Sequence, residues 1–452
     1  MSVKEPESTL IACEECGLVS EIPPMRGGQS ASCSRCGHTL VRRIEFPHAT
    51  MMAYGISSLV MLLLSTVFPF MSFSVQGIKH EITLMYAVKV FHYFGNNTLA
   101  VLLLITIIVL PALYILTLMY LFHVAEKHRR KAKPIRHPGL IKQLCRLVFR
   151  IETWLLVDVF LVGVLVSLVK IASLADVGMG HSFWAFCAYT VLVIKCMRNA
   201  DKEWLWEHLF PSYPVNGVKS GDTHLSGNHV ACGLCEQINP VVGEVPGNCV
   251  RCGSMLQPYE PERSLQWAWA FLIAAFIFYI PANLYPMMYT SSLGSTEVST
   301  IMDGVIMLWN MGSYPIAMVI FIASIFVPLT KMLILTWLFV SAKRGRVSED
   351  GESVVRLKYY RVTEIIGRWS MIDVFVVAIL TALVQLKGLM SITPGPAALY
   401  FALVVVLTIC SALVFDPRVF WGSFDGSQGK VQPESNSRTS MESGLVGKAE
   451  HE

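Results

Sequence analysis

The sequence predicts an all-α polytopic membrane protein with two parallel repeats of four transmembrane helices, each preceded by a small zinc-ribbon β domain. Three observations lead to this fold class. Of the 452 residues, 54% are hydrophobic and only 15% are charged, and the mean hydropathy is +0.53, which is typical of a polytopic membrane protein. Most of the 12 cysteines fall into C-x-x-C pairs. Motifs of the first half of the chain recur in the second half.

The apolar runs define the membrane helices and the domain boundaries. A helix needs about 20 residues to cross a hydrocarbon core of ~30 Å. Such runs occupy residues 49–73, 97–122, 153–175, 181–199, 265–289, 313–340, 369–390 and 396–415. The expected domains are a first head at residues 1–47, a first transmembrane domain at 48–200, a linker with a second head at 201–262, a second transmembrane domain at 263–421 and a disordered tail at 422–452.

The basic residues predict the orientation. Lys and Arg are concentrated in the loops 123–150 and 343–368, whereas the loop 290–312 contains neither. Because loops rich in Lys and Arg stay in the cytoplasm, both basic loops are expected there. An even number of crossings then places the two heads and both chain termini in the cytoplasm, whose reducing environment suits free thiols. The polar amino-terminal residues also show no cleavable signal peptide.

An internal repeat organises the chain. Residues 154–160 (Trp-Leu-Leu-Val-Asp-Val-Phe) reappear at 369–375 as Trp-Ser-Met-Ile-Asp-Val-Phe, and Pro111 in the second helix corresponds to Pro328 in the sixth. Since each half contains an even number of crossings, the two repeats have the same orientation in the membrane. The sequence therefore predicts a pseudo-twofold axis along the membrane normal.

The cysteine pairs predict two metal centres. A C-x-x-C turn presents two thiolates to one ion, and a second turn completes the tetrahedron that Zn²⁺ accepts. Four thiolates leave no open coordination position, which favours structural zinc over a redox-active or catalytic head; iron in a rubredoxin-like site stays an alternative. The expected ligands are Cys13, Cys16, Cys33 and Cys36 in the first head and Cys232, Cys235, Cys249 and Cys252 in the second.

Polar side chains at membrane depth form a second candidate site. A charged residue there costs about 2.5–3.5 kcal/mol on insertion scales, so each is a functional candidate. Ser324 and Lys331 are seven positions apart on the sixth helix. Ser370 and Asp373 are three positions apart on the seventh, so each pair shares a helix face. A buried network of Lys, Asp, Ser and Thr can carry protons. The candidates are Ser324, Lys331, Ser370, Asp373 and Thr408 in the second half and Lys170 in the first.

Each of these residues also has a structural interpretation. Lys331 could extend its amine to the membrane interface. Asp158 and Asp373 could act as interfacial caps near the basic loops, and the hydroxyl residues could serve helix packing. Only their combination favours a proton relay over packing.

Several long motifs resemble those of the paraquat-inducible protein A family. They are residues 281–286 (Pro-Ala-Asn-Leu-Tyr-Pro), 323–331 (Ala-Ser-Ile-Phe-Val-Pro-Leu-Thr-Lys), 369–375 and 395–400 (Gly-Pro-Ala-Ala-Leu-Tyr). Together with the tetracysteine heads, the resemblance extends over nearly all of 13–421. It implies a protein of the Gram-negative inner membrane that works beside a periplasmic partner with mammalian-cell-entry (MCE) domains, expected to be hexameric, whose rings form a tunnel for lipid.

The resemblance also implies that the polar cluster couples proton movement to lipid loading. One position departs from the family pattern: Ser173 stands where an acidic residue is expected after Lys170, and Asp176 follows one turn later.

These observations lead to one main hypothesis and two alternatives. The main hypothesis is a non-enzymatic, proton-coupled component of intermembrane lipid transport that binds membrane lipids and no nucleic acid. The chain has no G-x-x-x-x-G-K-[ST] loop, which argues against an ATPase. The alternatives are a membrane scaffold whose heads respond to redox state or metal, and a small-solute secondary transporter.

Overall fold

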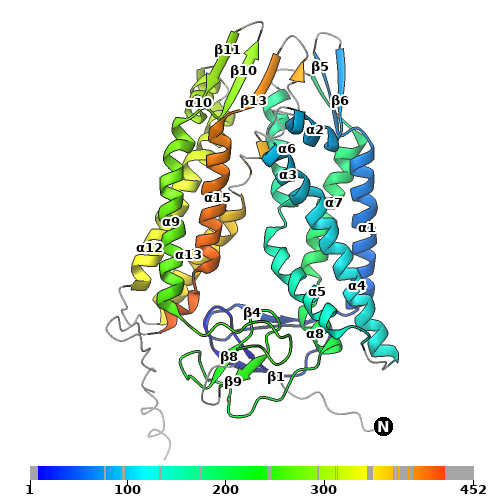
Figure 1. Ribbon diagram of the computed structural model, residues 1–452, viewed down its shortest axis with the longest axis vertical. Helices are drawn as coiled ribbons and strands as arrows, with labels where there is room; N and C mark the ends of the chain where they lie inside the picture. Colours follow the sequence, from blue (N-terminus) through cyan, green and yellow to red (C-terminus); the bar gives the residue numbers. More distant parts are fainter. Residues whose placement is uncertain are drawn as a thin grey trace, which may run out of the picture.

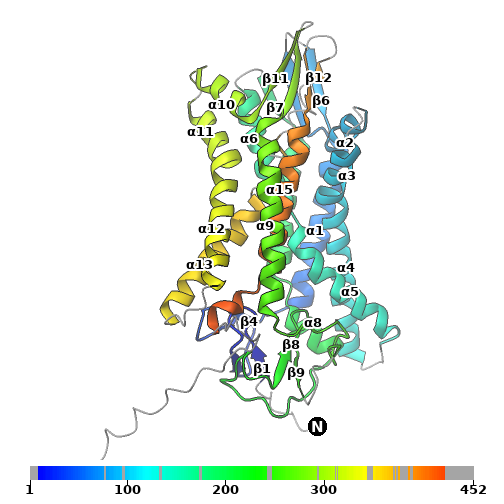
Figure 2. The same cartoon turned by 60° about the vertical axis from the view of Figure 1, so that its left-hand side comes forward.

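Two helical bundles stand side by side, with the cysteine heads at one end and β-hairpins at the other (Figure 1). The computed structural model describes residues 9–422 apart from 76–77, 94–96, 132–134, 173–175, 242–246, 293–294, 311, 313, 344–349, 370–371, 373–374, 377–384 and 387–389. The view in Figure 2 shows the same separation of the two ends. They are called the head end and the hairpin end below.

The first bundle follows the first head. Its helices are α1 (Pro47–Val67), α2 (Leu84–Tyr93), α3 (Asn97–Leu104), α4 (Leu110–Lys131), α5 (Pro138–Ile151), α6 (Val157–Ala172) and α7 (His181–Arg198). A short α8 (Lys202–Leu209) follows at the head end, and the Asp201 side chain caps it by accepting a hydrogen bond of 2.8 Å from Trp204 N.

The second bundle follows the second head. Its helices are α9 (Pro261–Leu284), α10 (Ile301–Asn310), α11 (Tyr314–Phe321), α12 (Val327–Lys343), α13 (Asp350–Trp369) and α15 (Pro396–Val414), followed by a 3₁₀ turn at Pro417–Trp421. The core pairs are α9 with α15 and, in the first bundle, α1 with α7.

A π-helical turn interrupts one long helix in each bundle. The turns are Ile105–Val109, before α4, and Ile322–Phe326, before α12. Each lies directly N-terminal to a helix whose second residue is proline, Pro111 or Pro328. Proline has no N–H and its ring clashes with the carbonyl four residues earlier, so the wider turn accommodates it without ending the helix.

Among the described residues, six helical segments are long and apolar enough to cross a membrane, so the chain is a multi-pass membrane protein. They are Pro47–Val67, Ile105–Lys131, Pro138–Leu168, Pro261–Leu284, Ile322–Lys343 and Pro396–Val414. Two further crossings were expected. The one at 181–199 is α7, whose 18 residues include His181, Lys195 and Arg198 and which is not among the six. The one at 369–390 lies mostly outside the described residues.

The hairpin end contains β-strands, whereas the sequence analysis predicted only helices in and next to the membrane region. In the first half β5 (Met71–Val75) pairs with β6 (Ile78–Ile82) and with β7 (Asp176–Met179). In the second half the order is β11 (Ser295–Ser299), β10 (Met288–Ser292), β13 (Met390–Pro394) and β12 (Gln385–Leu386). Gln385, Leu386 and Met390, which were expected in the helix 369–390, thus lie in antiparallel strands of this sheet.

The two heads are small hairpin domains that pack on each other. The first contains β1 (Thr9–Ala12) with β2 (Val19–Ile22) and β3 (Ser30–Ser32) with β4 (Thr39–Arg42); the second contains β8 (His229–Ala231) with β9 (Ile238–Pro240). Val19 N donates to Asp222 O at 2.8 Å, and Gly221 N donates back to Val19 O at 2.9 Å. The heads thus share backbone hydrogen bonds as well as an apolar cluster around Val19 and Ile238.

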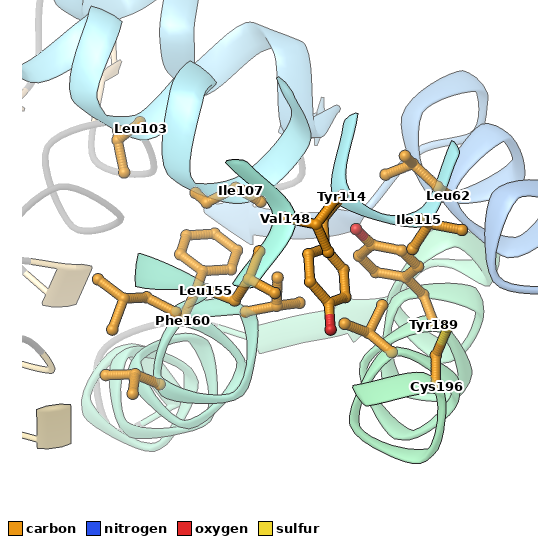
Figure 3. Packing of buried hydrophobic residues seen from close by; sticks show 14 of the residues in the cluster. Leu62, Leu103, Ile107, Tyr114, Ile115, Val148, Leu155, Phe160, Tyr189 and Cys196 are labelled. Carbon is orange, nitrogen blue, oxygen red and sulfur yellow. The ribbon is translucent and has the colours of Figure 1, made fainter. Parts of the chain in front are cut away.

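The core of the first bundle contains two tyrosines whose hydroxyl groups are buried. Tyr114 of α4 and Tyr189 of α7 lie among Leu62, Ile115 and other apolar side chains (Figure 3). Both are 0% exposed, and neither hydroxyl has a hydrogen-bond partner among the described residues. A buried unsatisfied hydroxyl costs roughly 1–3 kcal/mol. Tyr114 corresponds to Lys331 in the second bundle, so the two bundles differ in chemistry at this position.

Candidate metal centres and the buried lysine site

The first head brings its four cysteines to one point. Two of them follow β1 and two follow β3, and the four Sγ atoms lie within 4.8 Å of one another. Gly17 and Gly37 close the two turns with φ angles of +71° and +70°, a conformation that glycine adopts without steric cost. In each turn the glycine N–H donates to the first cysteine's carbonyl at 2.9 Å.

The second head repeats this arrangement with one difference. The Sγ atoms of Cys232 and Cys252 are 3.6 Å apart and those of Cys235 and Cys249 are 3.5 Å apart. Here the residue that closes the first turn is Glu236, with φ +59°, and its carboxylate pairs with Lys202 at 3.0 Å. A non-glycine residue in this region is uncommon, and the ion pair to α8 is a contact that glycine would lack.

Both sulfur clusters fit a tetrahedral metal ion. Zn–S bonds of about 2.3 Å place neighbouring sulfurs about 3.8 Å apart, close to the 3.5 and 3.6 Å found between sulfur atoms here. All eight cysteines are buried. Two buried four-cysteine clusters that could each bind one metal ion are therefore present, as the spacing predicted.

The first head packs under the second bundle. Arg361 of α13 donates from Nε to both carboxylate oxygens of Glu15, at 3.0 and 3.1 Å, and from Nη2 to Cys36 O at 3.1 Å. The Arg35 guanidinium lies 4.4 Å from the ring centroid of Trp421, which follows α15. The first head leads into the first bundle in sequence, yet these contacts join it to the second.

The second head packs under the first bundle in the same way. Arg251 donates from Nε to Phe210 O at 2.8 Å and from Nη1 to Cys235 O at 3.0 Å, and its guanidinium lies 6.0 Å from the ring centroid of Trp206. Arg146 of α5 donates to Gly253 O at 3.3 Å. The first head thus packs on the second bundle, and the second head packs on the first bundle. This arrangement is called the crossed packing below.

Sequence reasoning missed the arginines of this crossed packing. Arg35 and Arg251 occupy the same place in the two Cys-x-Arg-Cys motifs, and Trp206 and Trp421 follow matching aspartates. The shared motif was the available signal. Nothing local in the sequence indicates that each arginine stacks on the tryptophan of the other half.

Two carboxylates at the head contacts have altered acidity. Burial tends to raise the pKa of Glu15, but hydrogen bonds from His38 and Arg361 lower it below its usual value. Burial raises the pKa of Glu203 in α8 to about 7, although Arg43 opposes this shift. Arg43 lies 3.6 Å from Glu203 and 2.8 Å from Glu207, so one guanidinium serves two carboxylates.

The buried lysine lies in the second bundle. Lys331 of α12 is 3% exposed, and its Nζ donates to Thr408 Oγ1 of α15 at 2.9 Å. The Thr408 hydroxyl in turn donates to Val405 O at 2.9 Å. A third helix, α13, approaches the amine at Gly367. A Cβ added to this glycine would lie only 2.8 Å from Lys331 Nζ, so the absence of a side chain there leaves room for the amine.

The other predicted relay residues are placed only in part. Ser324 is buried in the π-helical turn before α12. Ser370 and Asp373 lie outside the described residues, and Lys170 is placed as backbone near the end of α6, where its side chain is not described. The structure thus brings Lys331 and Thr408 together, and the remaining members stay predictions.

A cavity of about 230 Å³ lies beside Lys331, between the two bundles. Glu152 and Thr153 line it from the first half, and Thr363, Glu364 and Gly367 line it from the second. The two bundles also meet through Phe160 of α6 and Phe375, whose rings make an edge-to-face contact at 5.4 Å. Neither glutamate was a candidate from the sequence, since both precede the recurring Trp-containing motif.

Comparison with known proteins agrees with this architecture. The family model described as paraquat-inducible protein A matches residues 49–210 and 265–425, one segment for each bundle. The chain belongs to the paraquat-inducible protein A family. The same family model thus matches a segment in each bundle.

Relatives in this family are named as transport proteins. Intermembrane transport protein PqiA of Escherichia coli (strain K12) is 41% identical over 91% of this chain and 95% of its own length. Lipophilic envelope-spanning tunnel protein A of the same strain is 26% identical over 92% of each chain. A probable intermembrane transport protein of Haemophilus influenzae is 26% identical over 93% of this chain and 97% of its own. No solved structure matches the chain.

Proposed function

We propose that this chain is the inner-membrane component of an intermembrane lipid transport system and not an enzyme. The observation that carries this proposal is the 41% identity, over 91% of the chain, to a relative named as an intermembrane transport protein. The name of a second relative describes a lipophilic tunnel that spans the envelope, which favours lipid as the cargo over a small polar solute.

The transport proposal is tested with energised membrane vesicles that contain the full chain and its partner. A fluorescent phospholipid serves as the probe, and its transfer to the partner is followed over time. We expect transfer that stops when an uncoupler is added, because the driving force is proposed to be a proton gradient. Transfer at the same rate in vesicles without the chain would contradict the proposal.

We propose eight crossings, as two parallel repeats of four, with the heads and both termini in the cytoplasm and the hairpin end in the periplasm. The heads and the hairpins lie at opposite ends of the molecule (Figure 1), and the last turn of α4, at the head end, carries Arg129, Arg130 and Lys131, as cytoplasmic segments do. The domain boundaries at 47, 200, 262 and 421 are kept in this proposal.

Cysteine labelling tests this orientation. Val298→Cys in β11 and Met255→Cys in the second head replace side chains that are 56% and 80% exposed. With a membrane-impermeant maleimide on intact spheroplasts, we expect Val298→Cys to be labelled and Met255→Cys to be labelled only after lysis. The unsubstituted protein gives the background from its own cysteines. Labelling of Met255→Cys in intact spheroplasts would invert the proposed orientation.

We propose that the periplasmic partner is a hexameric MCE-domain protein that docks at the hairpin end. This end is the one remote from the heads, and α10 exposes Ile306, Met307 and Trp309 there. Exposed apolar side chains that are grouped together often mark an interaction surface. The cargo would pass from the membrane to the partner at this end.

We propose that each four-cysteine cluster holds a structural Zn²⁺. The four cysteines close the coordination sphere, and a bound zinc supplies folding energy to a domain too small for a core of its own. In the second head, Asn239 Nδ2 lies 3.7 Å from Cys249 Sγ and Ser254 Oγ lies 3.2 Å from Cys232 Sγ, so polar groups next to the sulfurs support them.

We propose that transport is coupled to protons through Lys331, Thr408 and Ser324, together with Ser370, Asp373 and Lys170. The support comes from Lys331, an amine that is 3% exposed inside a membrane bundle and bonds to a hydroxyl. Ionisable residues in such positions commonly belong to proton pathways. Lys331 would bind and release one proton in each cycle.

A further inference from the structure

The cavity beside Lys331 is also lined by two glutamates that do not belong to the proposed proton relay. Glu364 of α13 and Glu152, just after α5, line it together with Lys331. Its volume of about 230 Å³ is several times the ~30 Å³ that one water occupies in the liquid. A cavity of this size, with Lys331, Glu152 and Glu364 among its otherwise largely apolar lining, can hold a short chain of water molecules.

The residues that line this cavity differ in exposure. Lys331 is 3% exposed and Thr363 is 1% exposed. Glu152 is half-buried, and Glu364 is exposed. The lining therefore combines an exposed carboxylate, a half-buried carboxylate and a buried amine, which are the groups that an entrance for protons requires.

The cavity lies on the head side of the lysine. Along α15, Ala412 and Leu413 line it, and both follow Thr408 in the direction of Trp421. Trp421 contacts the first head through Arg35. Hence the cavity extends from the Lys331–Thr408 pair toward the end of the molecule that holds the metal centres.

The two halves contribute matching positions to this cavity with different chemistry. Phe149 and Glu364 stand at equivalent distances before the recurring Trp, and so do Glu152 and Gly367. Gly367 has no side chain, and a Cβ there would lie 2.8 Å from Lys331 Nζ. The cavity thus lies where the repeats face each other, and Gly367 leaves the space that the amine occupies.

We propose that Glu364 and Glu152 form the head-side proton entrance to Lys331. This inference rests on the proposed proton coupling. In the release step the Lys331 ammonium gives a proton to water in the cavity, and this water gives a proton to one of the two carboxylates. The carboxylate then releases the proton to solvent at the head end. Uptake follows the same steps in reverse, and no electrons move. The Cys410 thiol of α15 is a further titratable group that interacts with the Lys331 amine.

The test uses the double variant Glu152→Gln/Glu364→Gln in the vesicle assay with fluorescent phospholipid. We expect transfer to slow by roughly tenfold or more, since positioned proton-transfer groups commonly contribute 10²–10⁴-fold. Formate, a weak acid small enough to enter the cavity, should restore much of the rate. Glu352→Gln is the matched control, because this exposed glutamate of α13 pairs with Arg356 at 3.1 Å and does not line the cavity.

The outcomes separate this inference from the function on which it rests. Unchanged lipid transfer in the double variant would overturn the proposed proton entrance. Slow transfer that formate does not restore would overturn it as well, because the two glutamates would then have a structural role. Protein level and thermal stability of the variant in detergent check its folding. Normal transfer in Lys331→Met would instead overturn the proton coupling itself.

Discussion

Lys331→Met is expected to abolish lipid transfer while the amount of protein in the membrane stays the same. Methionine is unbranched and close to lysine in length, so it fills the space between α12, α13 and α15 without the charge. Burying a charge in a membrane costs about 2.5–3.5 kcal/mol on insertion scales, and therefore the variant should be no less stable. What it loses is the amine that bonds to Thr408 at 2.9 Å, and with it the proton site.

The control for this variant lies on the same helix. Lys343 is in the last turn of α12 and is exposed, so Lys343→Met removes one lysine charge at the head end and should leave transfer within about twofold of the unsubstituted rate. Transfer is measured in energised vesicles, and protein level by immunoblot. Full transfer by Lys331→Met would mean that this buried amine only serves packing.

Cys16→Ser is expected to lower the stability of both bundles and to reduce the zinc content from two ions per chain to one. A structural zinc site contributes on the order of 10 kcal/mol to the folding of its domain, and a serine replaces one of four ligands. Because the first head contacts α13 and Trp421 as well as the second head, its loss removes contacts from both halves. Thermal unfolding in detergent and elemental analysis measure the two effects.

Cys187→Ser is the matched control for the metal site. Cys187 lies in α7, is partly buried and belongs to neither cluster, so its replacement should leave the zinc content at two and change the unfolding temperature by only a few degrees. If Cys16→Ser retained both ions, the cluster around it would not be the zinc site. Iron in place of zinc would appear directly in the elemental analysis.

Local patterns in the sequence were enough for the heads and for most of the membrane helices. Two C-x-x-C turns closed by residues such as Gly17 and Gly37 determine a four-cysteine cluster within about 25 residues, so little long-range information is required. Apolar length in the same way predicts α1, α9 and α15, each of which begins with a proline in its first turn. These features depend on neighbours in sequence.

The features that sequence reasoning missed depend on distant contacts. β10 pairs with β13 in the register Tyr289↔Thr393. Of the two strands, β10 has no alternation of apolar and polar residues from which a sheet could be predicted. The arrangement of Arg35 over Trp421 joins the two ends of the chain. Glu152 and Glu364 become notable only because the cavity brings them near Lys331. Ser370 and Asp373, which lie outside the described residues, stay predictions.

The crossed packing of the heads imposes an order on synthesis. When the second head leaves the ribosome, Trp206 and Phe210 have already been made, so it can dock at once. The first head is made before all other parts, but Trp421 follows it only after almost the whole chain, which takes tens of seconds at 5–20 residues per second. Its contacts with α8 and with the second head can form earlier, but the stacking of Arg35 on Trp421 can form only after translation of the last membrane helix.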